Sequence, residues 1–191
     1  MKLTHLFLLS TAAVVPAGAG AADPQVDVRT SAGTFRLELD PARAPKTVEN
    51  FLQYVKSGHY SGTVFHRVIG NFMIQGGGFD QKFQQKPTRP PIQNEAKNGL
   101  KNDVGTIAMA RTPDPHSASA QFFINLKNND FLNAAEAQDG WGYAVFGKVV
   151  SGMDVVAKIA RTPTGPAGPF GSDVPRPIVV IESMTVVDSK K

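Results

Sequence analysis

The residue types that most often carry catalysis are scarce in this chain of 191 residues. It has no cysteine, and its four histidines, at positions 5, 59, 66 and 116, form no H-E-x-x-H motif. No serine has the G-x-S-x-G context of a nucleophile elbow, and the glycine run 76–78 lacks the Lys-Ser/Thr pair of a phosphate loop. These observations exclude thiolate catalysis, argue against a metal site, and favour a tight turn after a strand for residues 76–78.

A second set of candidate residues is unusual for an enzyme. Apolar residues stand near the expected ends of strands, with one arginine and one glutamine among them. The apolar members are Phe72, Met73, Phe123, Phe131 and Leu132. By residue type alone they belong in a core, and Arg67 would be a surface or ion-paired arginine. Any function they have must therefore come from the motifs that contain them.

The elements that position these residues follow from hydrophobic periodicity. Runs 26–30 and 34–39 alternate apolar and polar residues around a glycine-bearing turn, which predicts a β-hairpin. Residues 45–56 predict an amphipathic helix, because a proline opens the segment and apolar residues recur at 48, 51, 52 and 55. Residues 153–160 predict a second, short helix. Further strands are predicted at 63–68, 72–75, 106–109, 121–125, 143–150 and 178–187.

Many short strands with two helices predict a mainly β fold. A closed antiparallel barrel with the helices over its open ends fits best, because closure removes exposed strand edges. Residues 80–105 form a long polar segment with three prolines, and its length suggests an ordered surface excursion.

The N-terminal segment predicts export. Lys2 precedes an apolar run, residues 6–15, and small residues with an A-x-A site at 19–21. We expect residues 1–21 to be a signal peptide, cleaved after Ala21 or Ala22, and residues 22–191 to form one domain in the periplasm or the medium. The apolar run is too short to span about 30 Å of hydrocarbon, so no permanent membrane anchor is expected. The absence of cysteine suits an oxidising compartment.

Three segments together resemble the cyclophilin family, in particular its bacterial exported branch. They are FHRVIGNFMIQGG at 65–77, AQFFI at 120–124 and VFGKV at 145–149. Their order, with a helix before the first, extends the resemblance across residues 25 to 188. It implies an eight-stranded antiparallel barrel with two capping helices, and peptidyl-prolyl cis-trans isomerisation without metal or organic cofactor.

Motif position then implies the site residues. Arg67 resembles the catalytic arginine of the family. The walls of the proline pocket would be Phe72, Met73, Phe123 and Leu132. Gln75, Arg111 and Gln121 would line the groove, with Arg111 acting mainly through its main chain. His66 is expected to be structural, because it points to the opposite face of its strand from Arg67.

Two further positions depart from the eukaryotic pattern. Phe131 stands where many eukaryotic members have Trp, and Tyr143 stands where they have His. Both would touch the outer groove, and the loss of the indole predicts weak binding of cyclosporin.

The expected partners are unfolded or partly folded exported proteins with X-Pro bonds, and the chain is expected to be a monomer. The formal charge of +4 is spread over scattered lysines and arginines, so nucleic-acid binding is not expected. An alternative is a chaperone that binds proline-containing segments with little turnover.

Overall fold

The computed structural model describes residues 22–187. The predicted signal peptide, residues 1–21, lies outside the described residues.

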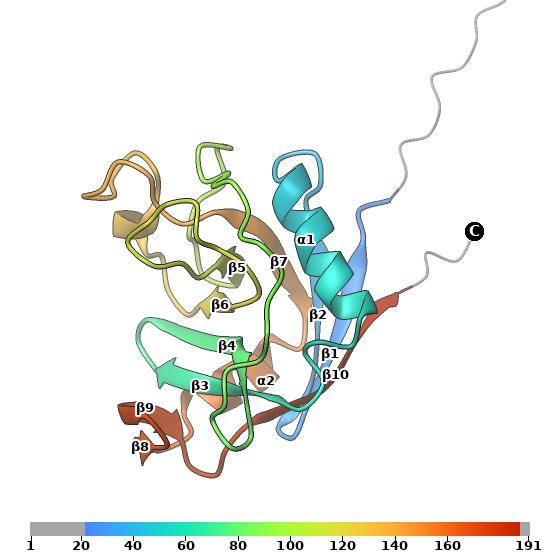
Figure 1. The fold of residues 1–191 in the computed structure, drawn as a ribbon, viewed down its shortest axis with the longest axis vertical. Coiled ribbons are helices and arrows are strands. Elements are labelled where there is room, and N and C mark those ends of the chain that lie inside the picture. The colour runs from blue at the N-terminus through green and yellow to red at the C-terminus, as the bar shows by residue number, and fades with distance from the viewer. Residues whose placement is uncertain (1–21, 188–191) are drawn as a thin grey trace, which may run out of the picture.

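In this part of the chain, eight strands close into an antiparallel barrel in the order β1-β10-β3-β4-β6-β5-β7-β2 (Figure 1). The strands are β1 (Gln25–Thr30), β2 (Gly33–Leu39), β3 (Thr63–Ile69), β4 (Met73–Asp80), β5 (Thr106–Met109), β6 (Phe122–Asn125), β7 (Val145–Ser151) and β10 (Val180–Val187). The predicted barrel is confirmed, and each predicted strand corresponds to one of these. The main difference is that β4 continues to Asp80 instead of ending at Gln75.

Both predicted helices are present, α1 (Pro45–Lys56) and α2 (Met153–Ala160). Helix α1 contacts β10, and α2 contacts β2, β3 and β4. Phe51 of α1 packs 5.1 Å from the ring of Phe146 in β7, and Val156 and Ile159 of α2 are fully buried in the same core. Within residues 22–187, no helix is long and apolar enough to cross a membrane.

The turn predicted at the glycine run 76–78 is wrong, because these residues lie inside β4. The register between β3 and β4 is irregular there, and Gly77 has a φ of +85°. A Cβ atom at Gly77 would lie 2.9 Å from ring carbons of Tyr60 and Phe122. Glycine is therefore required by a bulge that runs close to the aromatic core.

A small two-stranded sheet, β8 (Thr164–Ala167) and β9 (Phe170–Pro175), is an element that the sequence pattern does not predict. Residues 164–175 contain three prolines and three glycines, which obscure the alternation typical of a strand. Strand β9 packs against β3, as Figure 1 shows. The β8–β9 hairpin thus lies beside the strand that carries Arg67.

Candidate active site

Arg67 is the exposed residue of β3 next to the buried His66, which is 4% exposed. The register of β3 on β4 shifts between Phe65 and Arg67, and both His66 and Arg67 line a recess beside the β8–β9 hairpin, so the prediction that they lie on opposite faces is wrong. Arg67 lies opposite Gln75 in the register of β3 and β4. Its guanidinium carbon lies 5.9 Å from the centre of the Phe72 ring. Among the described residues, no ion pair includes Arg67. Its guanidinium is therefore available to a bound molecule.

A small recess of about 120 Å³ opens beside Arg67. It brings together eight of the ten predicted site residues: Arg67, Phe72, Met73, Gln75, Arg111, Phe123, Leu132 and Tyr143. Ala110 also lines the recess and was missed, although its position before Arg111 at the end of β5 is a usable signal. The walls belong to an apolar cluster separate from the main core. The recess therefore combines apolar side chains with the cationic and amide groups of Arg67, Arg111 and Gln75.

Three elements build the walls of this recess. Met73 begins β4, Phe123 lies in β6 opposite Gln75, and Leu132 ends the short 3-10 helix η1 (Asp130–Leu132). The ring of Tyr143 meets Phe123 edge to face, with 5.7 Å between ring centres. This contact between β6 and the loop before β7 helps to fix the shape of the pocket.

Gln121 and Phe131 are the two predicted residues that do not line the recess. Gln121 lies next to it, and its side-chain oxygen accepts a hydrogen bond of 3.0 Å from Gln75. Phe131 is 56% exposed and stacks on Phe72, with 5.7 Å between ring centres. It therefore forms the outer edge of the site.

Arg111 uses its side chain to hold a neighbouring loop, an arrangement beyond the predicted main-chain role. The side chain is 3% exposed, and its Nε donates to the carbonyl of Gly142 at 3.0 Å. Its guanidinium also pairs with Asp139 and lies 4.5 Å from the ring centre of Tyr143. Hydrogen bonds from the backbone N–H of Trp141 and from Arg111 lower the pKa of Asp139 to about 2. The loop that carries Tyr143 is thus fastened to the end of β5.

Buried asparagines support the same walls, and the sequence analysis missed them. They are Asn102, Asn125, Asn129 and Asn133. Asn129 donates to the Phe72 carbonyl at 3.0 Å and to Asn125 at 2.8 Å, while Asn102 donates to Asn133 at 3.2 Å and to the Tyr143 carbonyl at 3.3 Å. Asparagine is common in turns, so its type alone does not reveal a buried support.

His66 is buried between aromatic rings. Its ring centre lies 4.8 Å from that of Phe79 and 5.2 Å from that of Phe170. Burial lowers the pKa of His66 from 6.5 to about 4. At neutral pH the ring is therefore uncharged.

We expect this histidine to make the fold sensitive to mild acid. The unfolded chain binds the proton near pH 6.5 and the folded chain only near pH 4, so the free energy of unfolding falls as the pH drops through this window. The loss from His66 should approach about 3 kcal/mol. Urea unfolding at pH 7 and pH 4.5 checks it, and His66→Phe should reduce the difference. An identical pH dependence in that variant would contradict the assignment.

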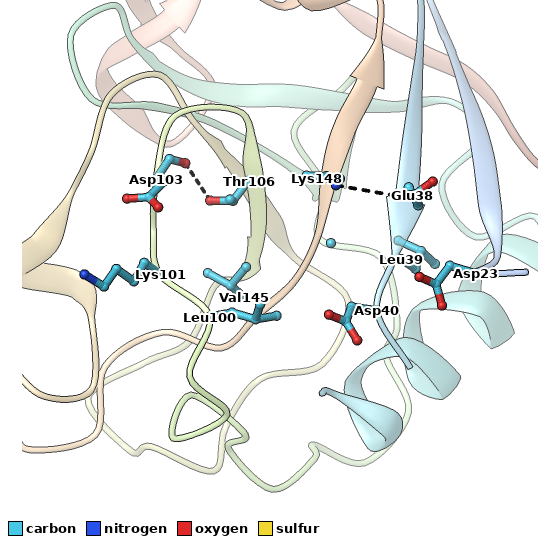
Figure 2. Close-up of a pocket in the computed structure, with 11 residues that line it drawn as sticks. Asp23, Glu38, Leu39, Asp40, Leu100, Lys101, Asp103, Thr106, Val145 and Lys148 are labelled. Carbon is cyan, nitrogen blue, oxygen red and sulfur yellow. Dashed lines mark hydrogen bonds and ion pairs between the residues drawn. The ribbon is translucent and has the colours of Figure 1, made fainter. Parts of the chain in front are cut away.

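A separate cavity of about 220 Å³ lies beside β2 and β7 (Figure 2). Its rim is charged, and Lys148 pairs there with Glu38 at 3.6 Å. None of the predicted site residues lines it. Within residues 22–187, no group of three or more His, Asp or Glu side chains could hold a metal ion.

Comparison with known proteins finds relatives along almost the whole described part of the chain. The family model for "Cyclophilin type peptidyl-prolyl cis-trans isomerase/CLD" matches residues 25–186. A peptidyl-prolyl cis-trans isomerase of Streptomyces antibioticus is 61% identical over 163 residues, which cover 85% of this chain and 98% of the relative. Peptidyl-prolyl cis-trans isomerase B of Escherichia coli is 56% identical over 162 residues, which cover 84% of this chain and 98% of the relative.

Solved structures show the same fold. A cyclophilin-type isomerase of Cryptosporidium parvum, crystallised in the presence of the dipeptide ala-pro, superposes with a TM-score of 0.69 at 26% identity, covering 86% of this chain and 99% of that one. The family predicted from the three motifs is therefore confirmed. The chain belongs to the cyclophilin-type peptidyl-prolyl cis-trans isomerases.

Proposed function

We propose that this isomerase acts on X-Pro bonds of exported proteins as they fold, and that Arg67 stabilises the twisted amide above an apolar proline pocket. The observation that carries the proposal is the recess beside Arg67, where apolar walls adjoin a guanidinium that has no ion pair among the described residues. The rate of isomerisation of a short proline peptide, compared between wild type and Arg67→Ala, tests it.

The chemical problem is a rotational barrier. The cis and trans forms before proline differ by only about 0.5–1 kcal/mol, but rotation breaks amide resonance and costs about 18–20 kcal/mol. At the twisted midpoint the prolyl nitrogen becomes pyramidal, and its lone pair can accept a hydrogen bond that the planar amide does not offer.

Arg67 suits this transition state. A guanidinium directed at the prolyl nitrogen donates a hydrogen bond mainly at the midpoint, so it lowers the barrier without tightening binding of the planar substrate. Arginine also stays protonated at any working pH, and its planar fork can hold the substrate carbonyl as well.

The recess supplies the complementary half of the mechanism. Walls such as Met73, Phe123 and Leu132 hold the proline ring while the preceding residue rotates. They also remove water from the amide, and the twisted form is less polar than the planar form and loses less from this. Rotation about the amide breaks no bond to hydrogen, so the proposed reaction transfers no proton.

The proposal of export rests on the N-terminal sequence. Cleavage after Ala21 or Ala22 would leave the barrel intact, since β1 begins at Gln25. We further propose that the mature enzyme works in the periplasm as a monomer, without nucleic acid, on unfolded or partly folded exported chains.

We expect the mature protein to begin at Ala22 or Asp23. Mass spectrometry of protein recovered from the periplasm or the medium gives the start directly. A chain that keeps Met1 and stays in the cytoplasm would overturn the proposed localisation.

We also expect cyclosporin to bind weakly. Phe131 has no N–H to donate, and a buried acceptor of the ligand without its partner costs about 1–3 kcal/mol. Phe131→Trp should tighten the Kd by about tenfold, whereas Phe131→Leu should not. Isothermal titration measures both, and wild-type binding as tight as that of the Trp variant would contradict the role of this position.

A further inference from the structure

A second recess of about 470 Å³ adjoins the proline recess. Arg67 and Gln75 line both. The remaining walls of the second recess come from two sources: His66 of β3 and Phe79 of β4 with Gln121, and residues 169–173 of the β8–β9 hairpin. The two recesses are therefore neighbours that share Arg67 and Gln75 in their walls.

The wall of the second recess is aromatic. The rings of His66, Phe79 and Phe170 each contact the other two, with ring centres 4.8 to 5.2 Å apart. The planes of Phe79 and Phe170 are perpendicular, at 90°. Phe83 also contacts Phe170, with 6.0 Å between ring centres. His66 adds no charge at neutral pH, because burial keeps its pKa near 4. Another aromatic ring placed here would gain edge-to-face or offset contacts beyond simple burial.

The hairpin that supplies Phe170 is held in place at its base. The backbone N–H of Arg176 donates to the Pro163 carbonyl at 2.7 Å, and the Arg176 side chain donates to the Pro166 carbonyl. Gly165 of β8 pairs with Val174 of β9, which is fully buried. A wall fixed in this way loses little conformational freedom when a ligand binds.

We propose that this second recess is a substrate subsite for an aromatic side chain that flanks the X-Pro bond. The proposal rests on the proposed function, because it takes the proline ring to occupy the smaller recess. A peptide held there crosses Arg67, and one or two further residues span the neighbouring recess at about 3.3 Å per residue.

The chemistry of the recess selects the occupant. Its volume is larger than that of the proline recess, so it accommodates a large side chain. Arg67 and Asp173 bring opposite charges to its lining, so neither a cationic nor an anionic side chain gains a clear advantage. The three rings favour an aromatic side chain over an aliphatic one.

The test uses proline peptides with alanine at the two positions on either side of the X-Pro pair. Each position is changed in turn to phenylalanine, and kcat/KM is measured for the wild type and the variants. At one position, phenylalanine should raise wild-type kcat/KM by about 3- to 10-fold over alanine. Phe170→Ala should bring this ratio close to one, and Phe170→Leu should lower it while keeping apolar volume in the hairpin.

Two matched variants locate the effect. Thr164→Ala changes an exposed residue of the same hairpin that does not line the recess, and it should keep the ratio. Phe131→Ala removes the competing aromatic surface at the outer edge of the site, and it should also keep the ratio. Circular dichroism verifies the fold of each variant.

Three outcomes would overturn the subsite: no position in wild type prefers phenylalanine, the preference survives both Phe170 variants, or Phe131→Ala removes it instead. Failure of the proposed function would give a different result. In that case the turnover of the all-alanine peptide would be the same in wild type and Arg67→Ala. If only the subsite is wrong, Arg67→Ala should still slow the turnover of that peptide.

Discussion

Arg67→Ala should lower kcat by about 100-fold or more while the Kd for a proline peptide changes little. The size follows from other transition-state hydrogen-bond donors, whose removal typically costs about 100- to 1000-fold in kcat. The asymmetry follows from the mechanism, because the planar amide offers no acceptor at its nitrogen and the bond forms mainly at the twisted midpoint. A protease-free isomerisation assay gives kcat, and titration calorimetry gives Kd.

Controls separate this mechanism from a general loss of charge. Arg67→Lys keeps the charge but loses the planar fork, so it should recover only part of the activity. Arg161→Ala removes an exposed arginine that does not line the recess and should behave as wild type. Wild-type turnover in Arg67→Ala would refute the mechanism and leave the family assignment intact. An equal loss in binding would mean that Arg67 holds the ground state.

The same experiment weighs the alternative of a proline-binding chaperone. Such a protein would bind the peptide but turn it over slowly in the wild type, and Arg67→Ala would change little. The proposed enzyme should instead show turnover that is nearly flat with pH while it stays folded, because no proton is transferred. A steep limb without loss of stability would point to a titrating catalytic group.

The barrel could be predicted because its local signals agree with one another. The 26–30 and 34–39 runs alternate cleanly, and α1 has a proline at its start and a single apolar face. The signals fail where glycine and proline serve tertiary contacts. The run 76–78 looks like a turn, but it lets a strand bulge past Tyr60 and Phe122. The β8–β9 hairpin is held by pairing that its composition does not indicate.

The site could be predicted only in part, because only some of its residues belong to motifs. Arg67 and the apolar walls lie in recognisable segments, and most of them meet in one recess. The supports of the walls come from loops without such patterns. Arg111 pairs with Asp139, although β6 and η1 separate them in the sequence. The buried asparagines also contact one another only after folding. Long-range contacts of this kind leave no periodic trace in the sequence.

Phe123→Ala should weaken both binding and turnover and should also destabilise the fold. Phe123 is a buried member of the apolar cluster behind the recess, and its neighbours include Met73, Leu132 and the Tyr143 ring. Removing the ring leaves a cavity and should cost about 3 kcal/mol of unfolding free energy. The proline ring loses part of the same apolar contact, so we expect Kd to rise about tenfold. Turnover should fall as well, because a loosely held proline rotates with the rest of the substrate.

A matched substitution distinguishes the pocket from the core. Phe35→Ala removes an equally buried ring from β2 in the main core, away from the recess. It should cost a comparable free energy of unfolding but leave Kd and kcat close to wild type at temperatures where the variant is folded. Phe123→Leu, which keeps much of the apolar volume, should fall between wild type and Phe123→Ala in all three measurements. If Phe123→Ala binds the peptide as tightly as Phe35→Ala does, Phe123 is a core residue and the proline ring is held elsewhere.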